Sequence, residues 1–334
     1  MRRMILIDVI VMAVLLASPC FGWGPDGHRI IGDIATRYLS PKARAAIKDL
    51  LGDQSLADVS TWADEVRKDS AYDYLKPLHY INVPRNAAKV DMARDCKNEQ
   101  CVIGAINHYT AVLKNRQSTR DERVTALKLL VHFVGDVHQP LHVSYEDDRG
   151  ANWVKAQFFD QGEKNLHAIW DESLIDHRMH ASGPPGGPPG GSAGGSGGER
   201  EAFEKDLFRR LTEKKLKEWR GVTSPVEWAN ESLAITRRLY KDVPGQAQVQ
   251  GQGQLMQIGE AYFEKNIGTV EDRLTAAGVR LAALLNTIFG DEKPTTRPST
   301  KVRVQTDGAE SEPTTAPAAG PPDVPDAPGP PEPQ

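Results

Sequence analysis

The sequence predicts an all-α fold, built as a single mainly helical domain. Between residues 23 and 290, apolar side chains recur at the three- and four-residue spacing of amphipathic helices. The same stretch contains no long series of strands and no internal repeat. Because 39% of the 334 residues are apolar, the chain can bury a large core. This composition excludes a wholly disordered protein and a polytopic membrane protein.

The first helix is expected over Asp26–Leu39, where Ile30, Ile31 and Ile34 share one face. Two later helices, over Val102–Leu113 and Arg123–Val137, are strongly amphipathic. The others are expected, in chain order, over Pro41–Leu51, Leu56–Arg67, Leu166–His180, Arg200–Trp219, Pro225–Tyr240 and Leu255–Phe289. One segment, Asn152–Phe159, alternates weakly between apolar and polar residues and predicts a strand in one small β-hairpin.

Residues 1–22 have the features of a secretory signal peptide. Arg2 and Arg3 give a positive start, an apolar run follows over residues 4–16, and small residues precede Trp23. A membrane anchor is the alternative, but the apolar run is short for a span. We therefore expect cleavage after Gly22, a secreted or periplasmic protein that begins at Trp23, and no stable membrane association.

Two further stretches have compositions that disfavour folding. Residues 183–198 are almost entirely glycine and proline, which predicts a flexible insert. From 291 to 334 the chain is rich in proline, threonine, alanine and acidic residues, which predicts a disordered tail. The folded domain is expected over 23–290, interrupted by the insert.

Charge and cysteine content narrow the function. The net charge of -4 argues against binding nucleic acid through bulk positive charge, so a phosphate-bearing ligand would need local cations or a metal.

Cys96 and Cys101, separated by four residues, suggest a local disulfide in an exported protein. Half of a zinc site is the alternative, although no second cysteine pair exists to complete it.

Histidines and aspartates recur together at helical spacing. His132 and Asp136 are four residues apart on an apolar helix, and His167 and Asp171 repeat the spacing on a second helix. Buried carboxylates are costly unless a cation meets them, and imidazole with carboxylate is a zinc ligand set. His142 follows Asp136 by six residues, beyond the predicted helix end. The pattern therefore predicts a metal site.

These residues lie in motifs that resemble a family of zinc-dependent, single-strand-specific nucleases. This family includes the fungal nucleases S-one and P-one and the bifunctional nucleases of plants and bacteria. The matching segments are Trp23–His28, Trp62–Arg67, Leu78–Asn82, His132–His142, Asp148–Asn152 and Asn165–Asp171. Each motif alone is moderately specific, but together, in this order over 23–290, they are highly specific.

The resemblance implies a helical fold around a cleft that holds three zinc ions, with Asp136 bridging the first two. By matching position, the first ion would be bound by Asp64, His79, His132 and Asp136. The second ion would be bound by the amine and carbonyl of Trp23, by His28 and by Asp136. The third ion would be bound by His142, His167 and Asp171.

The same resemblance implies a phosphodiester hydrolase that cuts single-stranded DNA and RNA to 5′-phosphate products and acts on 3′-nucleotides. Arg67, nearly one helical turn after Asp64, would stabilise charge on the phosphate, and Asp64 and Asp136 complete the expected catalytic set. A surface salt bridge is the alternative role for Arg67.

Three residues would contact the substrate. Tyr80 lies near the position of a base-stacking aromatic, although core packing is the alternative. Asn82 stands where the fungal enzymes carry an aspartate, so base preference and pH optimum can differ. Asn152 matches a substrate-contacting asparagine, and Ala151 replaces the usual glycine before it.

Two other functions remain open at this stage. The zinc phospholipases C share the fold and ligand layout but generally carry Glu and Asn at the positions of Asp171 and His138. A zinc-binding protein without catalysis is the other, but a third site with only three protein ligands and no cysteine favours an open, catalytic position. We expect a monomer.

Overall fold

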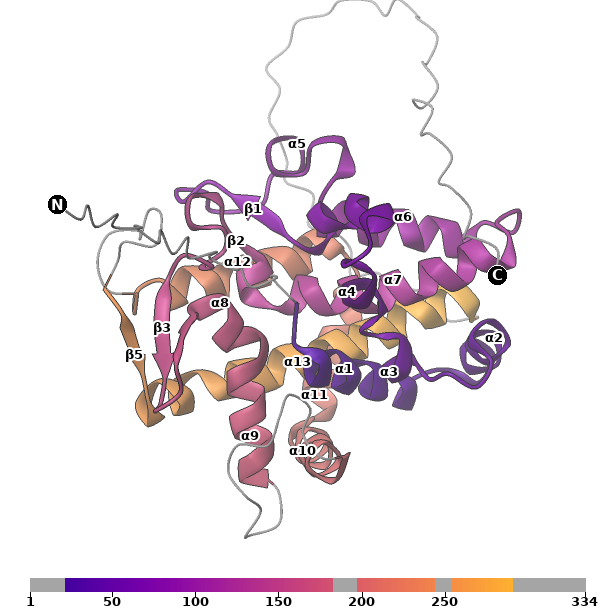
Figure 1. Ribbon diagram of the computed structural model, residues 1–334. Coiled ribbons are helices and arrows are strands. Elements are labelled where there is room, and N and C mark those ends of the chain that lie inside the picture. Colours follow the sequence, from indigo (N-terminus) through magenta and orange to yellow (C-terminus); the bar gives the residue numbers. More distant parts are fainter. Residues whose placement is uncertain (1–21, 183–196, 244–253, 291–334) are drawn as a thin grey trace, which may run out of the picture. The chain divides into compact units, whose positions relative to one another are not determined.

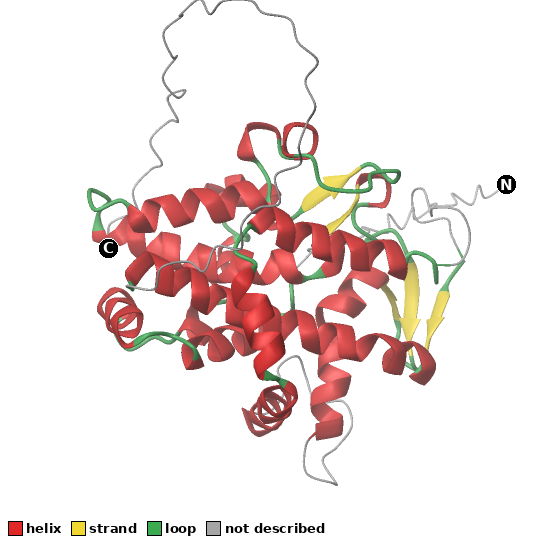
Figure 2. Ribbon diagram, turned by 180° about the vertical axis from the view of Figure 1, so that it is seen from behind, coloured by secondary structure: helices red, strands yellow, loops and turns green. Residues whose placement is uncertain are grey.

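The computed structural model describes residues 22–182, 197–243 and 254–290 (Figure 1). Helices make up most of this part of the chain, and the strands form two small sheets (Figure 2). The prediction of a mainly helical domain is therefore confirmed. The predicted signal segment up to residue 21, most of the glycine-rich insert and the tail from residue 291 lie outside the described residues.

The helices differ widely in length. The longer ones are α1 (Pro25–Arg37), α2 (Pro41–Leu51), α6 (Val102–Lys114), α7 (Arg120–His138), α10 (Gly197–Arg210), α12 (Pro225–Leu239) and α13 (Glu260–Phe289). The shorter ones are α3 (Leu56–Val59), α4 (Trp62–Val66), α5 (Met92–Asp95), α8 (Leu166–Ala168), α9 (Leu174–Ser182) and α11 (Glu213–Gly221). The tighter 3-10 turns are η1 (Ser70–His79), η2 (Lys97–Glu99), η3 (Pro140–His142) and η4 (Glu146–Asp148), and a π turn, η5, spans Ile169–Ser173.

Capping residues explain where several boundaries differ from the prediction. α7 begins three residues early because Thr119 and Glu122 form a capping box. The helix predicted over Leu56–Arg67 is two helices, since the Ser60 hydroxyl bonds to the Ala57 carbonyl at 2.7 Å and ends α3. The helix predicted over Arg200–Trp219 is likewise divided, because Thr212 caps a new helix, α11.

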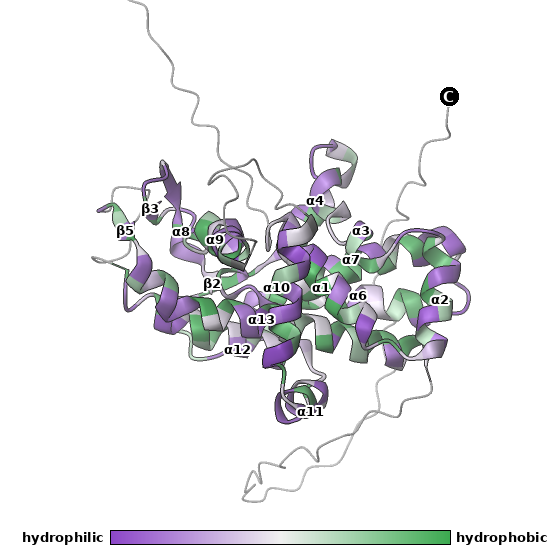
Figure 3. Cartoon of the chain, turned by 90° about the horizontal axis from the view of Figure 1, so that it is seen from below, coloured by the Kyte–Doolittle hydropathy of each residue, from purple (hydrophilic) through white to green (hydrophobic). Residues whose placement is uncertain are grey.

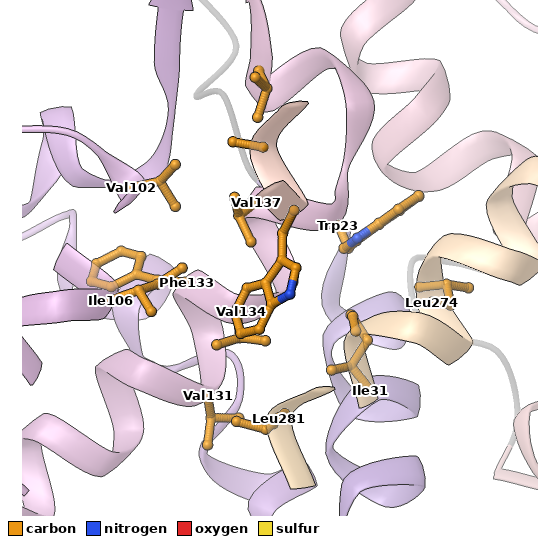
Figure 4. Close-up of a cluster of buried hydrophobic side chains, with 14 of the residues drawn as sticks. Trp23, Ile31, Val102, Ile106, Val131, Phe133, Val134, Val137, Leu274 and Leu281 are labelled. Atoms are coloured by element: carbon orange, nitrogen blue, oxygen red, sulfur yellow. The ribbon is translucent and has the colours of Figure 1, made fainter. Parts of the chain in front are cut away.

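Buried helices α7 and α13 form the centre of the core. From Ala126 to His138, every residue of α7 except half-buried Lys128 is buried. α6 packs on α7, and α1 packs on α13. Trp23 is fully buried within the apolar cluster (Figure 4). α11, by contrast, is largely hydrophilic (Figure 3). Among the described helices, none is both long and apolar enough to cross a membrane.

The sheets are small but place parts of the site. β1 (Ile81–Val83) pairs in parallel with β2 (Val143–Tyr145), with Ile81 opposite Val143. This pairing, which the sequence analysis missed, aligns the segments that directly follow His79 and His142. The predicted hairpin is confirmed as β3 (Lys155–Phe158) and β4 (Glu163–Asn165), and β5 (Met256–Ile258) adds a parallel strand where a helix was expected.

The predicted disulfide joins Cys96 and Cys101, whose Cα atoms are 5.3 Å apart. Cys101 is the residue that caps α6. The next residue, Val102, donates its backbone N–H to the carbonyl of Tyr80 at 3.0 Å. The disulfide loop is thus joined directly to the start of β1.

α10 meets α1 through a pair of carboxyl groups, Glu204 and Asp33, which share a hydrogen bond. Arg200 lies nearby, with Nε 3.4 Å from Glu204 Oε1. Burial, together with the charge of Asp33, raises the pKa of Glu204 to about 8. Folded Glu204 therefore keeps a proton that the unfolded chain loses above about pH 4.5.

The contribution of Glu204 to the free energy of unfolding should consequently be complete below pH 4.5 and be lost as the pH rises to about 8. We expect a loss on the order of 2 kcal/mol, because the pair is only partly buried. Glu204→Gln should flatten this dependence, since the amide cannot ionise. Denaturant unfolding at pH 5 and pH 8.5 measures the difference, and an equal pH slope in both proteins would contradict it.

Candidate metal centre

Asp136 lies at the centre of a buried cluster of histidines. It follows His132 by one turn of α7, and neither side chain is exposed. Asp136 Oδ2 lies 3.0 Å from His79 Nδ1 and 3.3 Å from His132 Nε2. The other oxygen, Oδ1, lies 3.4 Å from His28 Nε2. The two oxygens of one carboxylate therefore face different histidines, as a carboxylate that bridges two cations must.

Two groups of candidate ligands meet at this carboxylate. One consists of Asp64, His79 and His132, and the other of His28, His132 and Asp136. In each group the nitrogen and oxygen atoms lie within 4.8 Å of one another. The family resemblance assigned His132 to the first zinc site only. In the structure, His132 lies within reach of both groups.

A third group lies beside the first two and consists of His142, His167 and Asp171. His142 Nε2 is 3.9 Å from Asp171 Oδ1, and His167 Nε2 is 3.5 Å from Asp171 Oδ2. His167 enters from α8, directly after β4, and His142 from η3, directly before β2. The β1–β2 pairing links this group to the others, since His142 Nδ1 bonds to the carbonyl of His79 at 2.7 Å.

Backbone carbonyls orient three of the histidines in the same way. Nδ1 of His132 bonds to the Ser60 carbonyl at 2.8 Å, and Nδ1 of His167 bonds to the Gly150 carbonyl at 2.5 Å, as His142 does to His79. A carbonyl only accepts, so Nδ1 donates a proton, and Nε2 is the ring atom that faces the carboxylates and could bind a metal ion in place of a proton. Such bonds fix the ring and tautomer of metal-binding histidines.

Backbone hydrogen bonds hold the segment around Trp23 beside the metal groups. Gly24 donates its N–H to the carbonyl of Asp171 at 2.8 Å, and His28 donates its N–H to the carbonyl of Gly24 at 3.1 Å. Gly22 is pressed against the cluster, because a methyl group added there would lie 1.8 Å from Asp136 Oδ1 and 2.8 Å from His28 Nε2. The peptide bond before Trp23 therefore lies beside the ligands.

The donor atoms fit a bound cation. Buried polar atoms are normally hydrogen-bonded. Within the described residues, both ring nitrogens of His28, Nε2 of His79 and Oδ1 of Asp136 are buried without a hydrogen bond. A divalent metal would satisfy inward-facing atoms of this kind, and nitrogen with carboxylate oxygen is a donor set that transition metals accept.

The charges of the cluster support the same interpretation. Burial opposes ionisation of Asp136, but His132 and His142 hold its pKa well below the usual range. Burial likewise opposes charge on His132, yet Asp136 and Asp64 raise its pKa to about 9. Burial lowers the pKa of His28 and His79, which favours their neutral forms. A metal ion that replaces the His132 proton would be stabilised by the same two carboxylates, Asp136 and Asp64.

The sequence profile of one family, described as S1/P1 Nuclease, matches residues 23–290. The chain belongs to the S1/P1 nuclease family. Endonuclease 2 of Arabidopsis thaliana is 34% identical over 304 residues, which cover 84% of this chain and 96% of the relative. Nuclease P1 of Penicillium citrinum is 29% identical over 279 residues, covering 81% and 99%. Nuclease S1 of Aspergillus oryzae is 35% identical over 175 residues, covering 51% and 60%.

Family membership confirms the resemblance read from the motifs and the prediction of a phosphodiester hydrolase. It also removes the phospholipases C as the family of this chain. The structure adds three His/Asp groups that could bind metal. All three groups lie within residues 23–290, the part of the chain that the family profile matches.

The other predicted site residues lie around the metal groups. Arg67 follows α4, and its NH1 lies 3.2 Å from Asp64 Oδ1, with only 16% of its side chain exposed. The two side chains form a partly buried salt bridge rather than a fully exposed one. Tyr80 is 37% exposed, so part of its side chain faces solvent. Asn82 lies half-buried in the middle of β1, opposite Ser144.

Asn152 lies in a tight loop after η4. Its side-chain amide donates to the carbonyl of Arg149 at 2.8 Å. Arg149, Gly150 and Ala151 all have positive φ, with Ala151 at 66°. Ala151 thus adopts the left-handed conformation that a glycine takes at low cost. Asp148, which accepts from Ala151 N and from the Tyr240 hydroxyl, anchors this loop to α12.

Some residues of the site were not singled out from the sequence. Gln139 donates its side-chain amide to Asp171 Oδ1 and so orients a candidate ligand. Gly135 permits α7 to approach α1, because a methyl group there would lie 2.8 Å from the His28 ring. The position of Gln139 between His138 and His142 was the available signal. His138 itself bonds to Val134 and Arg280, away from the metal groups.

Proposed function

We propose that this chain is a secreted, zinc-dependent endonuclease that hydrolyses single-stranded DNA and RNA to products with a 5′-phosphate. It would also release phosphate from 3′-nucleotides. The observation that carries the proposal is the Asp136 carboxylate, whose two oxygens face separate histidines beside a third His/Asp group. Paired metals on a shared carboxylate are a common arrangement in enzymes that cleave phosphodiesters.

The proposed site holds three zinc ions. Nitrogen and carboxylate ligands without sulfur suit zinc at a catalytic site. The ligands in the three sites would be Asp64, His79, His132 and Asp136; Trp23, His28 and Asp136; and His142, His167 and Asp171. When bound, zinc lowers the pKa of a coordinated water to about 7 and stabilises negative charge on phosphate.

Side chains around the metal groups would position the phosphate of the substrate. Arg67, held by Asp64 at 3.2 Å, points its charge at the edge of the first ligand group. A guanidinium in this place would bind a phosphate oxygen and stabilise the added charge of the transition state. The third group has only three protein ligands, which leaves positions for substrate oxygens.

Preference for single strands would follow from Tyr80. Its ring is exposed directly after the ligand His79, so an unpaired base can stack on it near the metal groups. A base inside a duplex is already stacked and cannot reach the ring. Asn82 and Asn152 would add hydrogen bonds to the bound nucleotide, with an amide at Asn82 in place of the fungal carboxylate.

Residues 1–22 would direct export and then be removed, which leaves Trp23 as the first residue. Its free amine and its carbonyl could then bind the second zinc ion. We propose a secreted or periplasmic protein that acts as a monomer. Sequencing of the N-terminus and light scattering of the exported protein test these points.

The test of the function uses the exported protein with denatured DNA, duplex DNA, RNA, a 3′-nucleotide and phosphatidylcholine. We expect denatured DNA and RNA to be cut to 5′-phosphate ends, duplex DNA to be cut much more slowly, and lipid to be unchanged. Cleavage of lipid with inert nucleic acid would reassign the chemistry to a phospholipase. Bound zinc with neither activity would indicate a non-catalytic zinc protein.

Replacing Arg67 with alanine should lower kcat about 100-fold while the bound metal stays unchanged, because the side chain would act on the phosphate. Arg67→Lys keeps the charge and should retain a substantial part of the activity. Steady-state kinetics and metal analysis of both variants measure this. Undiminished hydrolysis by the alanine variant would rule out a catalytic role for Arg67.

A further inference from the structure

We propose that three hydroxyl side chains on α12 are positioning residues for the candidate metal centre. Ser232, Thr236 and Tyr240 form one row, and each bonds to a different segment that presents candidate ligands. None of the three metal groups found among the described residues includes a residue of α12. The inference rests on the proposed function, because it concerns how the ligands of that site are held in place.

The three hydroxyls lie on one face of α12. They are four residues apart, a spacing that puts helical residues on the same face, about 6 Å apart along the axis. Tyr240 directly follows α12 but keeps helical backbone angles, with φ -67° and ψ -10°, and its N–H bonds to the Thr236 carbonyl at 3.0 Å. Ser232 and Thr236 are fully buried, and Tyr240 is half-buried. Buried hydroxyls normally have hydrogen-bond partners.

The middle hydroxyl, on Thr236, finds its partners outside its own helix. A threonine inside a helix often bonds to the carbonyl four residues before it. Thr275 of α13 does so, at 2.7 Å from the Glu271 carbonyl. Thr236 instead bonds to the carbonyls of Pro140 and Val143, the latter at 3.1 Å. Its hydroxyl therefore spans the turn η3, which carries a ligand of the third metal group.

Ser232 holds the end of α7. Its hydroxyl donates to the carbonyl of Val137 at 2.6 Å, directly after Asp136. The last carbonyls of a helix have no partner within that helix. Arg273 of α13 caps the same end, because its Nε donates to the His138 carbonyl at 3.0 Å and its Nη2 to the Ser232 hydroxyl at 2.8 Å. The carboxylate that faces two metal groups thus lies beside a helix end fixed by α12 and α13.

Tyr240 holds the loop after η4. Its hydroxyl donates to the Asp148 carboxylate at 2.7 Å, and the same carboxylate accepts the N–H of Ala151 at 2.9 Å. Within this loop, the Gly150 carbonyl accepts from His167 Nδ1 at 2.5 Å. The Tyr240 hydroxyl therefore acts on His167 through Asp148 and the Gly150 carbonyl.

The third metal group depends on this support more than the other two. Its histidines come from very short elements, His142 from the three-residue turn η3 and His167 from the three-residue helix α8. Such short helical segments are not stable by themselves. His132 and Asp136, by contrast, lie on α7, which has 19 residues. Loss of the Thr236 or Tyr240 hydroxyl should therefore weaken the third group most.

The first test measures the zinc affinity of Thr236→Val by titration against a chelator. Valine keeps the shape of the side chain and removes the hydroxyl. We expect the affinity of one of the three zinc sites to fall about 10-fold, because the backbone that orients its ligand is released, and the other two affinities to stay unchanged. Thr236→Ser restores a hydroxyl and should restore the affinity.

Thr275→Val is the matched control. It also removes a buried threonine hydroxyl, but one that bonds only within its own helix, α13. Both valine variants lose a buried hydrogen bond, so their thermal unfolding temperatures should fall by similar amounts. Only Thr236→Val should change zinc binding. Weakening of zinc by Thr275→Val to the same extent would show a general loss of stability and overturn the inference.

A double variant assigns the weakened site. His142→Ala removes a ligand of the third group, so that two zinc ions should remain bound. Adding Thr236→Val to His142→Ala should leave the affinities of these two ions unchanged, because the two positions act on the same site. If Thr236→Val weakens zinc equally with and without His142, the hydroxyl does not act through the third group.

A measurement on the metal-free protein separates this inference from the proposed function. NMR of protein with ¹⁵N-labelled histidine follows the Nδ1 proton of His142, which bonds to the His79 carbonyl at 2.7 Å, and that of His167. Exchange with solvent should become about 10-fold faster for His142 in Thr236→Val and for His167 in Tyr240→Phe. Unchanged exchange in both variants would overturn the inference. Faster exchange in a protein that cuts no nucleic acid would contradict the proposed function alone.

Discussion

Asp136→Asn is expected to lower hydrolysis at least ~1000-fold and to remove about two of the three proposed metal ions. The side chain is fully buried, and its two oxygens lie 3.0 to 3.4 Å from three histidine nitrogens. Asparagine has nearly the same shape but lacks the negative charge, and one of its oxygens becomes an amide that cannot bind a cation. The third group, around Asp171, should keep its metal.

Metal analysis together with steady-state kinetics checks this result. Asp206→Asn is the matched control, because Asp206 of α10 pairs with Arg178 of α9 at 3.0 Å and belongs to no metal group. The control should keep full metal content and activity. If Asp136→Asn still binds three ions and turns over normally, Asp136 does not bridge a metal pair.

The second large effect concerns the residue before Trp23. A protein that begins with one extra residue, for example Met-Trp23, should lose about one metal ion and about 100-fold in activity. The extra residue converts the terminal amine to an amide, whose nitrogen cannot bind a metal while it keeps its proton. It would also take the place of Gly22, which lies against Asp136 and His28.

The experiment releases Trp23 from a cleavable fusion and compares it with the extended form. Removal of the extra residue by an aminopeptidase should restore both metal and activity, which separates this effect from misfolding. Equal metal content and equal activity in the two forms would show that the Trp23 amine is not a ligand. The buried position of Trp23 would then be explained by packing alone.

The i,i+4 pairs were accessible from sequence because helical periodicity fixes which residues share a face. His132 with Asp136 and His167 with Asp171 indeed lie 3.3 and 3.5 Å apart. α7 was recognised from its apolar pattern alone, but its first turn was missed because Arg120–Glu122 are polar and only the capping box marks them. Periodicity identifies the buried part of a helix better than its ends.

Contacts between distant segments were not accessible in the same way. The strands of the β1–β2 pair have three residues each, too few to show an alternating pattern. This pair nevertheless brings His79 beside His142. The turns of η1, interrupted by Pro77, have no 3.6-residue period, so this segment was not predicted as a helix. The carbonyls that orient the histidines carry no sequence signature at all.

The most direct test of the account is the metal content of the exported protein, measured together with its activity during removal and return of zinc. We predict close to three zinc ions per chain, loss of single-strand cleavage with a chelator, and recovery when zinc is restored. A protein that cuts single strands at full rate after every metal ion has been removed would contradict the central claim.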